Sequence, residues 1–320
     1  MKRPGPITID QPLAPLSGYK TGGTAKYFLE TDELAVLQSA LLWAQREDLE
    51  AFFLGSGTNV LFPDGSLNKL VIRWAQKGIE VNAEKQLVVG AGEELQEVVT
   101  FALKHDILNF AWAAGLPGTV GAAVRGNVGA FGQDISEVFI QASYLDLASP
   151  LNLQTYTKPE MDFAYRTSTI KTKEHLVLKV WLTNRGGNGS EMEREKQNAD
   201  KHLGFRQSRH PLQYPNCGSV FKNITDPERV KTLVDHWPAW SEMVDRRWYG
   251  KVPAAAIIEA TGLKNTSVGG ARISDQHANF IINHQGASSQ DVMDLIALVQ
   301  EKVSQRFDVR LEPEIKIING

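Results

Sequence analysis

Two side chains that can take part in chemistry lie two positions apart in YPNCGSVFKN, residues 214–223. Cys217 is the only cysteine of the chain, and Ser219 follows it after one glycine. A thiol is the stronger nucleophile, so a lone cysteine suggests a nucleophilic or redox role. No histidine stands in a recognisable activating motif with Cys217, and unpaired cysteines are usually small buried residues. We therefore expect Cys217 to pack in the interior.

Glycine-rich turns are a second possible source of binding chemistry. GSGTN, residues 55–59, follows a short apolar stretch, and residues 112–132 carry six glycines in 21 positions, with a helix that could begin near Thr119. Strand-turn-helix units of this kind expose backbone N–H groups that bind phosphate. Neither segment matches G-x-G-x-x-G, and residues 90–95 lack its third glycine, so no Rossmann site is expected. Taken singly, each loop is more often an ordinary turn.

The elements that must position these loops alternate between helix and strand. Residues 31–48 have an apolar face at helical spacing, and Thr31 can cap their start. The same pattern predicts strands at 49–55 and 86–92 and a helix at 93–105. This order favours an α/β arrangement in the first part of the chain.

The pattern changes beyond residue 140. Alternating apolar residues predict antiparallel or mixed strands at 138–147 and 175–184. Residues 186–204 read as a glycine-rich linker that leads into a charged helix, which favours a domain boundary near 188. A helix at 288–307, with a capping box from Ser288 and Asp291, and a strand at 309–318 are expected at the end.

Composition limits the partners. The chain has 320 residues, 42% hydrophobic and 22% charged, with a net charge of −3. These values are typical of a soluble protein of two or three domains and favour a small-molecule partner, not nucleic acid or a membrane. One cysteine allows neither an internal disulfide nor a structural zinc site, and no metal site is expected. Without a signal peptide or an apolar span, we expect a cytoplasmic protein.

Six blocks in order carry a family resemblance: GSGTNVLFPDG (55–65), AGLPGTVGAAVRGNVGAFG (114–132), FAYRTS (163–168), CGSVFKN (217–223), GGARISDQHANFIIN (269–283) and LEPEIKII (311–318). Together with YKTGGTAKYF (19–28), they resemble the successive signatures of the UDP-N-acetylenolpyruvoylglucosamine reductase (UDP-N-acetylmuramate dehydrogenase) family, which consists of flavoenzymes of peptidoglycan synthesis. The resemblance is to the branch that lacks a tyrosine-bearing loop insertion.

The resemblance implies a fold that mixes α/β and α+β parts. By this resemblance, the chain would have an FAD-binding fold of the vanillyl-alcohol-oxidase (PCMH) type in two subdomains, followed by a C-terminal α+β substrate-binding domain. We expect the first subdomain at 1–75, the second at 76–188, the substrate-binding domain at 189–308 and a C-terminal strand at 309–320. The residues expected at FAD are Gly55, Ser56, Gly57, Thr58, Asn59, Gly115, Gly118, Thr119, Gly121, Gly129, Ala130 and Gly132.

The resemblance also implies a reaction and its residues. Hydride from reduced FAD would reach the enolpyruvyl ether of UDP-N-acetylglucosamine-enolpyruvate, with NADPH as the co-substrate. Ser219 matches the family's proton donor, Arg166 the arginine at the substrate carboxylate, and Glu314 the acidic residue beside the intermediate. Glu314 would have to be protonated or act through a hydrogen bond. On general burial statistics alone, Arg166 and Glu314 would be exposed charges.

Further substrate contacts are expected from Arg206, Arg209, Asn223 and His277. The alternative interpretation of the two arginines is a solvated helix end, and the family has glutamine at the position of His277 in one branch. The segment 224–252 contains three tryptophans, which could cover the substrate or form local core. We expect a monomer.

Two other functions share part of this pattern. A flavin oxidase of sugars or alcohols would keep the glycine loops, but it has no reason to carry Arg166, Ser219 and Glu314 together. A catalytically silent protein that binds a nucleotide-sugar would hold the ligand without a yellow cofactor. Because no histidine lies in 51–65 or 112–132, we expect FAD to be bound non-covalently.

Overall fold

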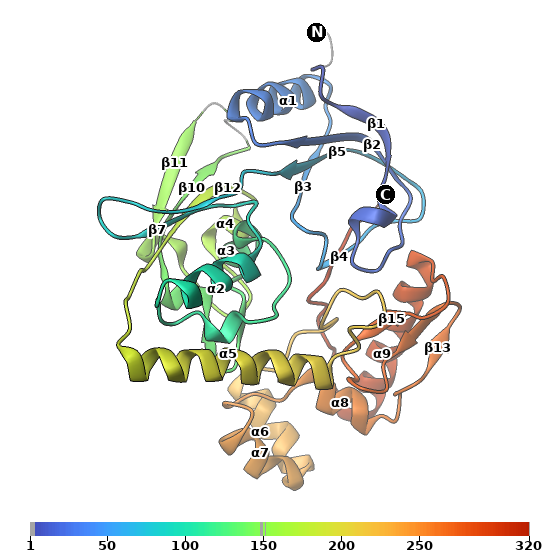
Figure 1. Cartoon of the computed structure of the whole chain (residues 1–320). Coiled ribbons are helices and arrows are strands. Elements are labelled where there is room, and N and C mark those ends of the chain that lie inside the picture. Colours follow the sequence, from blue (N-terminus) through green and yellow to red (C-terminus); the bar gives the residue numbers. More distant parts are fainter. Residues whose placement is uncertain (1–3, 148–149, 151, 320) are drawn as a thin grey trace. The chain divides into compact units, whose positions relative to one another are not determined.

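The computed structural model describes residues 4–147, 150 and 152–319, which form two compact units, each with its own hydrophobic core. Unit 1 comprises Met1–Gln11, Ala25–Ser56 and Asn68–Arg206, and unit 2 comprises Pro12–Thr24, Gly57–Leu67 and Gln207–Gly320. Each unit is therefore built from segments far apart in the sequence (Figure 1).

The first sheet of unit 1 has the strand order β1-β2-β5-β3. Its strands are β1 (Thr8–Pro12), β2 (Thr24–Thr31), β3 (Ala51–Leu54) and β5 (Ser66–Trp74). The expected first helix is present as α1 (Leu34–Arg46), which packs on this sheet through an edge-to-face contact of Tyr27 and Trp43, with ring centroids 5.0 Å apart. Its N-cap differs from the prediction: Glu33 holds that position, and the Thr31 hydroxyl accepts a hydrogen bond from the Glu33 amide.

The second sheet of unit 1 has the order β11-β10-β12-β7-β6, and all its pairings are antiparallel. Its strands are β6 (Ile79–Val81), β7 (Leu87–Gly90), β10 (Phe139–Leu145), β11 (Leu153–Thr157) and β12 (Leu176–Leu182). The strands predicted at 86–92, 138–147 and 175–184 are thus confirmed. The glycine-containing turn that follows β7 therefore lies at one end of a buried strand.

Helices and short turns complete unit 1. The helices are α2 (Leu95–Lys104), α3 (Val120–Gly126), α4 (Thr169–Thr172) and α5 (Gly189–Arg209), and a small hairpin pairs β8 (Gly129–Ala130) with β9 (Gln133–Asp134). The compact units divide at Arg206, and not near residue 188 as expected, because α5 makes its polar contacts with residues 110–131 of unit 1.

Unit 2 combines short strands with α-helices. A parallel pair joins β4 (Val60–Leu61) to β16 (Lys316–Ile317), and an antiparallel sheet has the order β13 (Ser267–Val268), β14 (Ala271–Ile273) and β15 (Ile281–Asn283). The helices are α6 (Pro227–His236), α7 (Ser241–Arg246), α8 (Ala254–Ala260) and α9 (Ser289–Phe307). The predicted capping box of α9 is confirmed, whereas the strand predicted at 309–318 is regular only over β16.

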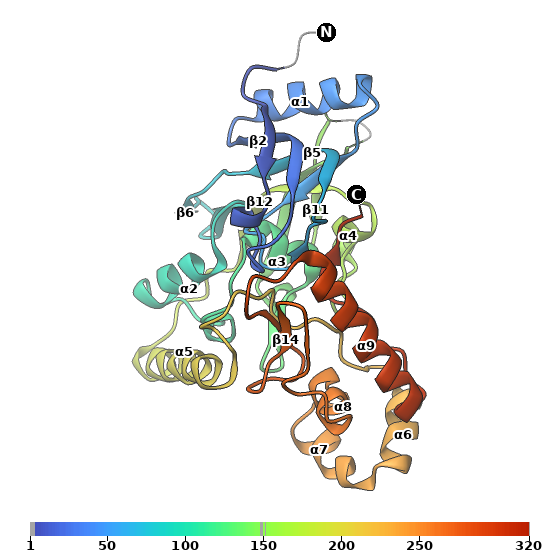
Figure 2. The same ribbon diagram turned by 90° about the vertical axis from the view of Figure 1, so that its right-hand side faces the viewer.

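The tryptophans of segment 224–252 are partly buried and pack against the core of unit 2. The ring centroids of Trp237 and Trp240 lie 4.3 and 5.7 Å from that of Phe307 at the end of α9. Figure 2 shows α6 beside α9 in this unit. Of the two alternatives for this segment, the structure supports local core.

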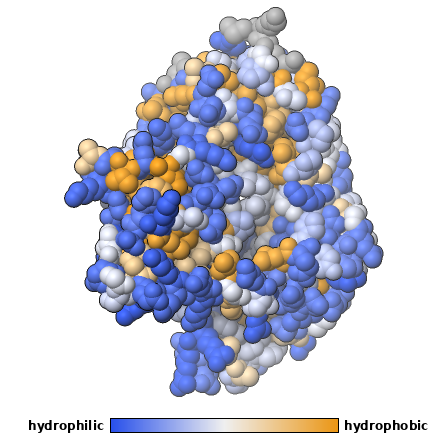
Figure 3. Space-filling model, viewed as in Figure 1, coloured by the Kyte–Doolittle hydropathy of each residue, from blue (hydrophilic) through white to orange (hydrophobic). Residues whose placement is uncertain are grey.

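Hydrophilic residues cover most of the face shown in Figure 3, with hydrophobic residues in smaller patches between them. Among the residues that the structure describes, no helix is both long and apolar enough to cross a bilayer.

Candidate functional site

Three glycine turns converge in unit 1. Gly55 follows β3, and a Cβ atom built on it would lie 2.9 Å from Oγ1 of Thr119, the N-cap residue of α3. The Ser56 hydroxyl donates a 2.6 Å hydrogen bond to the carboxylate of Glu94, which precedes α2. The Leu95 amide in turn donates to the Gly118 carbonyl at 2.9 Å. The turns after β3, after β7 and before α3 therefore form one cluster.

The first turn of α3 uses its amides within the protein. The Val120 amide donates to the Glu93 carbonyl at 2.8 Å, and the Gly121 amide donates to the Ala91 carbonyl at 2.9 Å. A Cβ atom on Gly121 would lie 2.9 Å from Cβ of Ala91. Close packing against Ala91, the residue after β7, is thus sufficient to require glycine at 121, and the amides of Val120 and Gly121 are already used within the protein.

Three other amides of the cluster have no hydrogen-bond partner among the described residues. Within residues 4–147, 150 and 152–319, the backbone N–H groups of Ser56, Gly118 and Thr119 donate no hydrogen bond. Gly118 has φ of +121°, a conformation open to glycine alone among ordinary residues. Unpaired amides on adjacent turns can bind an anionic group such as phosphate.

The β8–β9 hairpin brings Arg166 to a second glycine segment. The two turn residues, Phe131 and Gly132, have φ of +55° and +85°, the left-handed pair that a tight hairpin requires. A Cβ atom on Gly129 would lie 2.5 Å from the Gln133 carbonyl oxygen. Nη1 of Arg166 donates to the Gly129 carbonyl at 3.4 Å, so residues from 129–132 and 163–168 meet.

Arg166 itself has a strained backbone. Its φ is +59°, within a turn closed by hydrogen bonds in both directions between Ala164 and Thr167. The Lys171 ammonium donates to the Arg166 carbonyl at 2.6 Å, and the guanidinium lies 5.4 Å from the ring centre of Tyr165. Non-glycine residues held in the left-handed region are uncommon and cluster at functional sites.

In unit 2, Ser219 and Glu314 lie on paired segments. The Val220 amide donates to the Asn279 carbonyl at 2.8 Å, and the Glu314 amide donates to the Val220 carbonyl at 2.7 Å. The Ser219 hydroxyl makes no hydrogen bond to any residue that the structure describes. It is partly exposed, so it can bond to a ligand.

Cys217 packs in the core of unit 2, as predicted. Its side chain is 3% exposed, and its thiol donates to the Val60 carbonyl at 3.3 Å. Burial raises the pKa of the Cys217 thiol to about 11, which disfavours the thiolate that nucleophilic chemistry needs.

The two predicted arginines before the serine block differ in environment. Arg206 is 6% exposed and donates to the carbonyls of Ala114 at 2.9 Å and Trp112 at 3.2 Å, both in unit 1. Arg209, at the end of α5, is exposed. Of these two arginines, Arg209 is the one that presents an exposed guanidinium to solution.

Asn223 and His277 are engaged within unit 2. The Asn223 side-chain oxygen accepts from the Ala254 amide at the start of α8, at 3.1 Å. Nδ1 of His277 accepts from the Asn279 amide at 3.2 Å. Burial lowers the pKa of His277 to about 4, so the ring is neutral at pH 7 with its proton on Nε2.

Comparison with known proteins decides the family. Residues 25–148 match the model of the FAD binding domain, and residues 210–318 match that of the UDP-N-acetylenolpyruvoylglucosamine reductase C-terminal domain. UDP-N-acetylenolpyruvoylglucosamine reductase of Synechococcus sp. (strain JA-3-3Ab) is 35% identical over 319 residues, which cover 99% of this chain and 92% of the relative. The Enterococcus faecalis (strain ATCC 700802 / V583) protein of the same name is 34% identical over 313 residues, covering 98% and 94%.

The chain belongs to the UDP-N-acetylenolpyruvoylglucosamine reductase family. It is an FAD-binding oxidoreductase, and the predicted PCMH-type fold with a C-terminal domain is confirmed. The crystal structure of UDP-N-acetylenolpyruvylglucosamine reductase from Thermus caldophilus is 23% identical, with a TM-score of 0.76 over 98% of this chain and all of that one. This likeness shows the shared fold.

The unit 1 cluster fits the FAD expected in this reductase family. The amides of Ser56, Gly118 and Thr119, which have no partner among the described residues, suit a diphosphate. Asn127 ends α3 and is 5% exposed, and its side-chain oxygen has no partner among the described residues. A buried oxygen of this kind requires a donor, and the flavin ring carries one N–H group.

Sequence reasoning missed three residues of the candidate site: Asn127, Glu94 and Asn279. Glu94, which orients Ser56, lies in the turn at 90–95 that fails the dinucleotide motif. Asn279 lies in the block 269–283, and its amide side chain donates to and accepts from the Phe221 backbone, both at 2.9 Å. Two signals in the sequence could have indicated two of these residues. Glu94 lies in a glycine-containing turn, and Asn279 is a polar residue between apolar ones.

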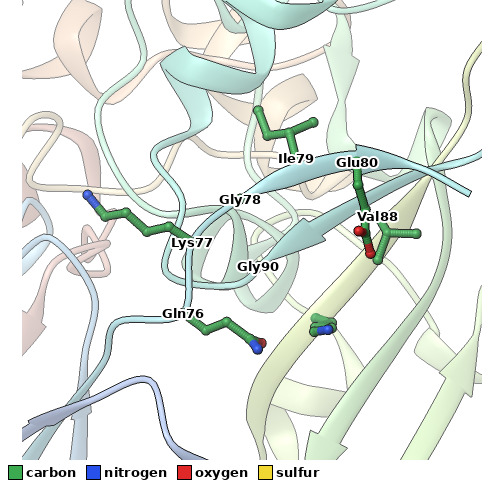
Figure 4. Close-up of a pocket in the computed structure, with 8 residues that line it drawn as sticks. Gln76, Lys77, Gly78, Ile79, Glu80, Val88 and Gly90 are labelled. Carbon is green, nitrogen blue, oxygen red and sulfur yellow. The ribbon is translucent and has the colours of Figure 1, made fainter.

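A pocket of about 220 Å³ lies elsewhere in unit 1, at the β6–β7 hairpin. It is lined by Gln76, Lys77, Gly78, Ile79, Glu80, Val88, Gly90 and Lys179 (Figure 4). None of the residues expected to bind FAD or substrate lines it. The convergent glycine turns, and not this pocket, are the candidate cofactor site.

Proposed function

We propose that this chain reduces the enolpyruvyl ether of UDP-N-acetylglucosamine-enolpyruvate to UDP-N-acetylmuramate, with NADPH as reductant, in the synthesis of peptidoglycan precursors. Similarity to relatives of that name along nearly the whole chain supports the substrate. The observation that carries the proposal is the convergence of unpaired amides and glycine turns in unit 1, in a chain that also keeps Arg166, Ser219 and Glu314.

FAD, when bound, supplies the hydride after NADPH has reduced it. The amides of Ser56, Gly118 and Thr119 would hold the diphosphate, and residues 129–132 would lie against the ring. Because residues 51–65 and 112–132 contain no histidine, we propose non-covalent binding. The further proposed contacts are Gly55, Gly57, Thr58, Asn59, Gly115 and Gly121.

Arg166, Ser219 and Glu314 have separate roles in the proposed reaction. Addition of hydride to the substrate leaves negative charge beside its carboxylate, and the Arg166 guanidinium would pair with that carboxylate. The Ser219 hydroxyl would donate its proton to the neighbouring carbon, because a carbanion-like intermediate is basic enough to be protonated by a weak acid. Glu314 would stabilise the intermediate through a hydrogen bond.

Three further residues are proposed to contact the nucleotide-sugar. Arg209 is exposed and can pair with phosphate oxygens of either ligand. His277 is neutral and would act as a hydrogen-bond donor through Nε2, and Asn223 would contribute its amide group. Because the sequence lacks a dinucleotide motif, we propose that NADPH and the enolpyruvyl substrate bind in turn at the flavin. We also propose that the protein is a monomer.

Anaerobic spectroscopy tests this proposal. The purified protein should be yellow, and NADPH should bleach the flavin absorption. Subsequent addition of the enolpyruvyl substrate, without oxygen, should restore the absorption. UDP-N-acetylglucosamine, which lacks the vinyl ether, is the matched control and should leave the reduced spectrum unchanged. A yellow protein that oxygen reoxidises but substrate does not would indicate a flavin oxidase. A colourless protein that binds UDP-sugar would indicate the silent binder.

A further inference from the structure

Helix α5 contacts the rest of unit 1 through polar side chains on one face. Glu195, Ala199, His202 and Arg206 follow one another at spacings of four, three and four residues, which places them on one side of a helix. The structure describes all of α5, and only Met192, Ala199 and Arg206 of it are buried. Surface helices usually pack through an apolar stripe. The attachment of α5 therefore depends on directional polar contacts.

Two opposite charges of α5 hold the two ends of one short turn. The Glu195 carboxylate accepts from the amides of Phe110 and Ala111, both at 2.8 Å. The Arg206 guanidinium donates to the carbonyls of Trp112 and Ala114. The turn η2 (Ala111–Ala113) thus has an anion at its amide end and a cation at its carbonyl end, as the peptide dipoles favour.

Arg206 is held by this loop and by an aromatic ring. Its guanidinium lies 5.0 Å from the ring centre of Phe131, over the turn of the β8–β9 hairpin. Burial lowers the pKa of Arg206 to about 10, so the group is still charged at neutral pH. A buried cation is tolerated only when oriented partners surround it. Its position therefore fixes the positions of both the loop carbonyls and the Phe131 ring.

His202 links the same two segments. Its Nδ1 lies 3.0 Å from the Ala111 carbonyl oxygen, and its ring stacks on Phe131 with centroids 3.8 Å apart and planes 8° apart. Phe131 has φ of +55°, which is unfavourable for a residue with a bulky side chain. Stacking by His202 and Arg206 stabilises that conformation.

We propose that Glu195, His202 and Arg206 are positioning residues that preorganise residues 110–115 and 129–132 for FAD. The inference rests on the proposed assignment of these segments to FAD binding. A loop already held in its bound shape loses less conformational entropy when the ligand binds, so affinity rises. Arg206 then acts through the loop and is not the substrate contact that the sequence suggested. The same contact requires glycine at position 115. Its φ is +75°, and a Cβ atom built on it would lie only 3.1 Å from Cδ of Arg206.

The release of FAD from diluted holoprotein tests the inference. Free FAD fluoresces more strongly than bound FAD in most flavoproteins, so the signal gives a dissociation constant without an activity assay. Arg206→Lys keeps the charge but loses the forked geometry, and we expect about tenfold weaker FAD binding. Arg194→Ala removes a charge from the exposed side of α5 and should bind FAD like the unmodified protein.

A matched pair at His202 keeps the test decisive if Arg206→Lys does not fold. His202→Phe keeps a ring on Phe131 and loses the hydrogen bond, whereas His202→Asn keeps a donor and loses the stack. We expect each to weaken FAD binding, because each removes one of the two links. An unchanged FAD dissociation constant in both His202 variants, even with a lower unfolding temperature, would overturn the inference alone. An unmodified protein that binds no FAD would overturn it together with the proposed function.

Discussion

The Glu314 amide donates a 2.7 Å hydrogen bond to the carbonyl of Val220, the residue that follows Ser219. The Glu314 carbonyl in turn accepts from the side chain of Asn59 at 3.2 Å. The proposed proton donor and the proposed acidic residue are therefore fixed by one backbone network within unit 2.

Asn279 should control the position of the Ser219 segment. Asn279→Asp replaces the amide that donates to the Phe221 carbonyl by a group that repels it. We expect a loss of about 1–3 kcal/mol in the free energy of unfolding, because a buried carbonyl loses its partner. Urea denaturation measures this loss, with Asn198→Asp on the exposed side of α5 as the matched control.

The same variant should separate the two halves of the reaction. NADPH should still bleach the flavin of Asn279→Asp, while reoxidation by the enolpyruvyl substrate slows. Equal slowing of both halves would contradict a specific role for Asn279 in positioning Ser219.

Cys217 should be dispensable for turnover. Cys217→Ala removes a buried thiol that packs against β4, and we expect a cost of about 1 kcal/mol in unfolding free energy with turnover retained. Since burial raises the thiol pKa to about 11, iodoacetamide should label the native protein slowly and the urea-unfolded protein quickly. Fast labelling of native protein with loss of turnover would contradict this assignment.

His277 should make unit 2 less stable in acid. Its folded-state pKa of about 4 lies below the ordinary value near 6.5, so between these values the unfolded chain binds more protons than the folded one. Stability is therefore unaffected by this group above pH 6.5 and falls as the pH drops toward 4, by at most about 1.4 kcal/mol per pH unit. His210 and Phe280 pack against the ring, and Lys264 and Glu259 are the charges that act on it.

His277→Gln supplies the comparison for that pH dependence. Gln keeps a polar side chain but does not titrate, so the variant should lose less stability between pH 6.5 and 4 than the unmodified protein. Guanidinium chloride denaturation at several pH values measures the difference. Identical slopes for the two proteins would show that another group is responsible.

Local signals predicted most elements of the fold. Ser288 and Asp291 of the capping box lie within one turn of each other, and the apolar face of α9 follows directly at helical spacing, so the sequence alone indicates both. The helix cap predicted at Thr31 failed, because a hydroxyl two residues upstream can also bond to the Glu33 amide in a turn. Local sequence does not distinguish these two arrangements.

The partners of α5 were beyond sequence reasoning. Arg206 lies in a charged helix without an apolar stripe, where solvent exposure is the usual outcome. Its burial follows from the backbone carbonyls of residues 112 and 114, which no side-chain pattern reveals. Glycines 115 and 121 were expected at FAD from the sequence, and the close approach of α5 to Gly115 and of Ala91 to Gly121 is a second reason for glycine that the sequence does not reveal.

The proton donor is tested most directly by Ser219→Ala in anaerobic stopped-flow measurements. The variant loses only a hydroxyl that makes no hydrogen bond to the described residues, so folding and FAD binding should persist. NADPH should reduce its flavin at the unmodified rate, while reoxidation by the enolpyruvyl substrate should slow by about a hundredfold or more, as expected for loss of a general acid. Reoxidation at the unmodified rate would contradict the assignment of Ser219.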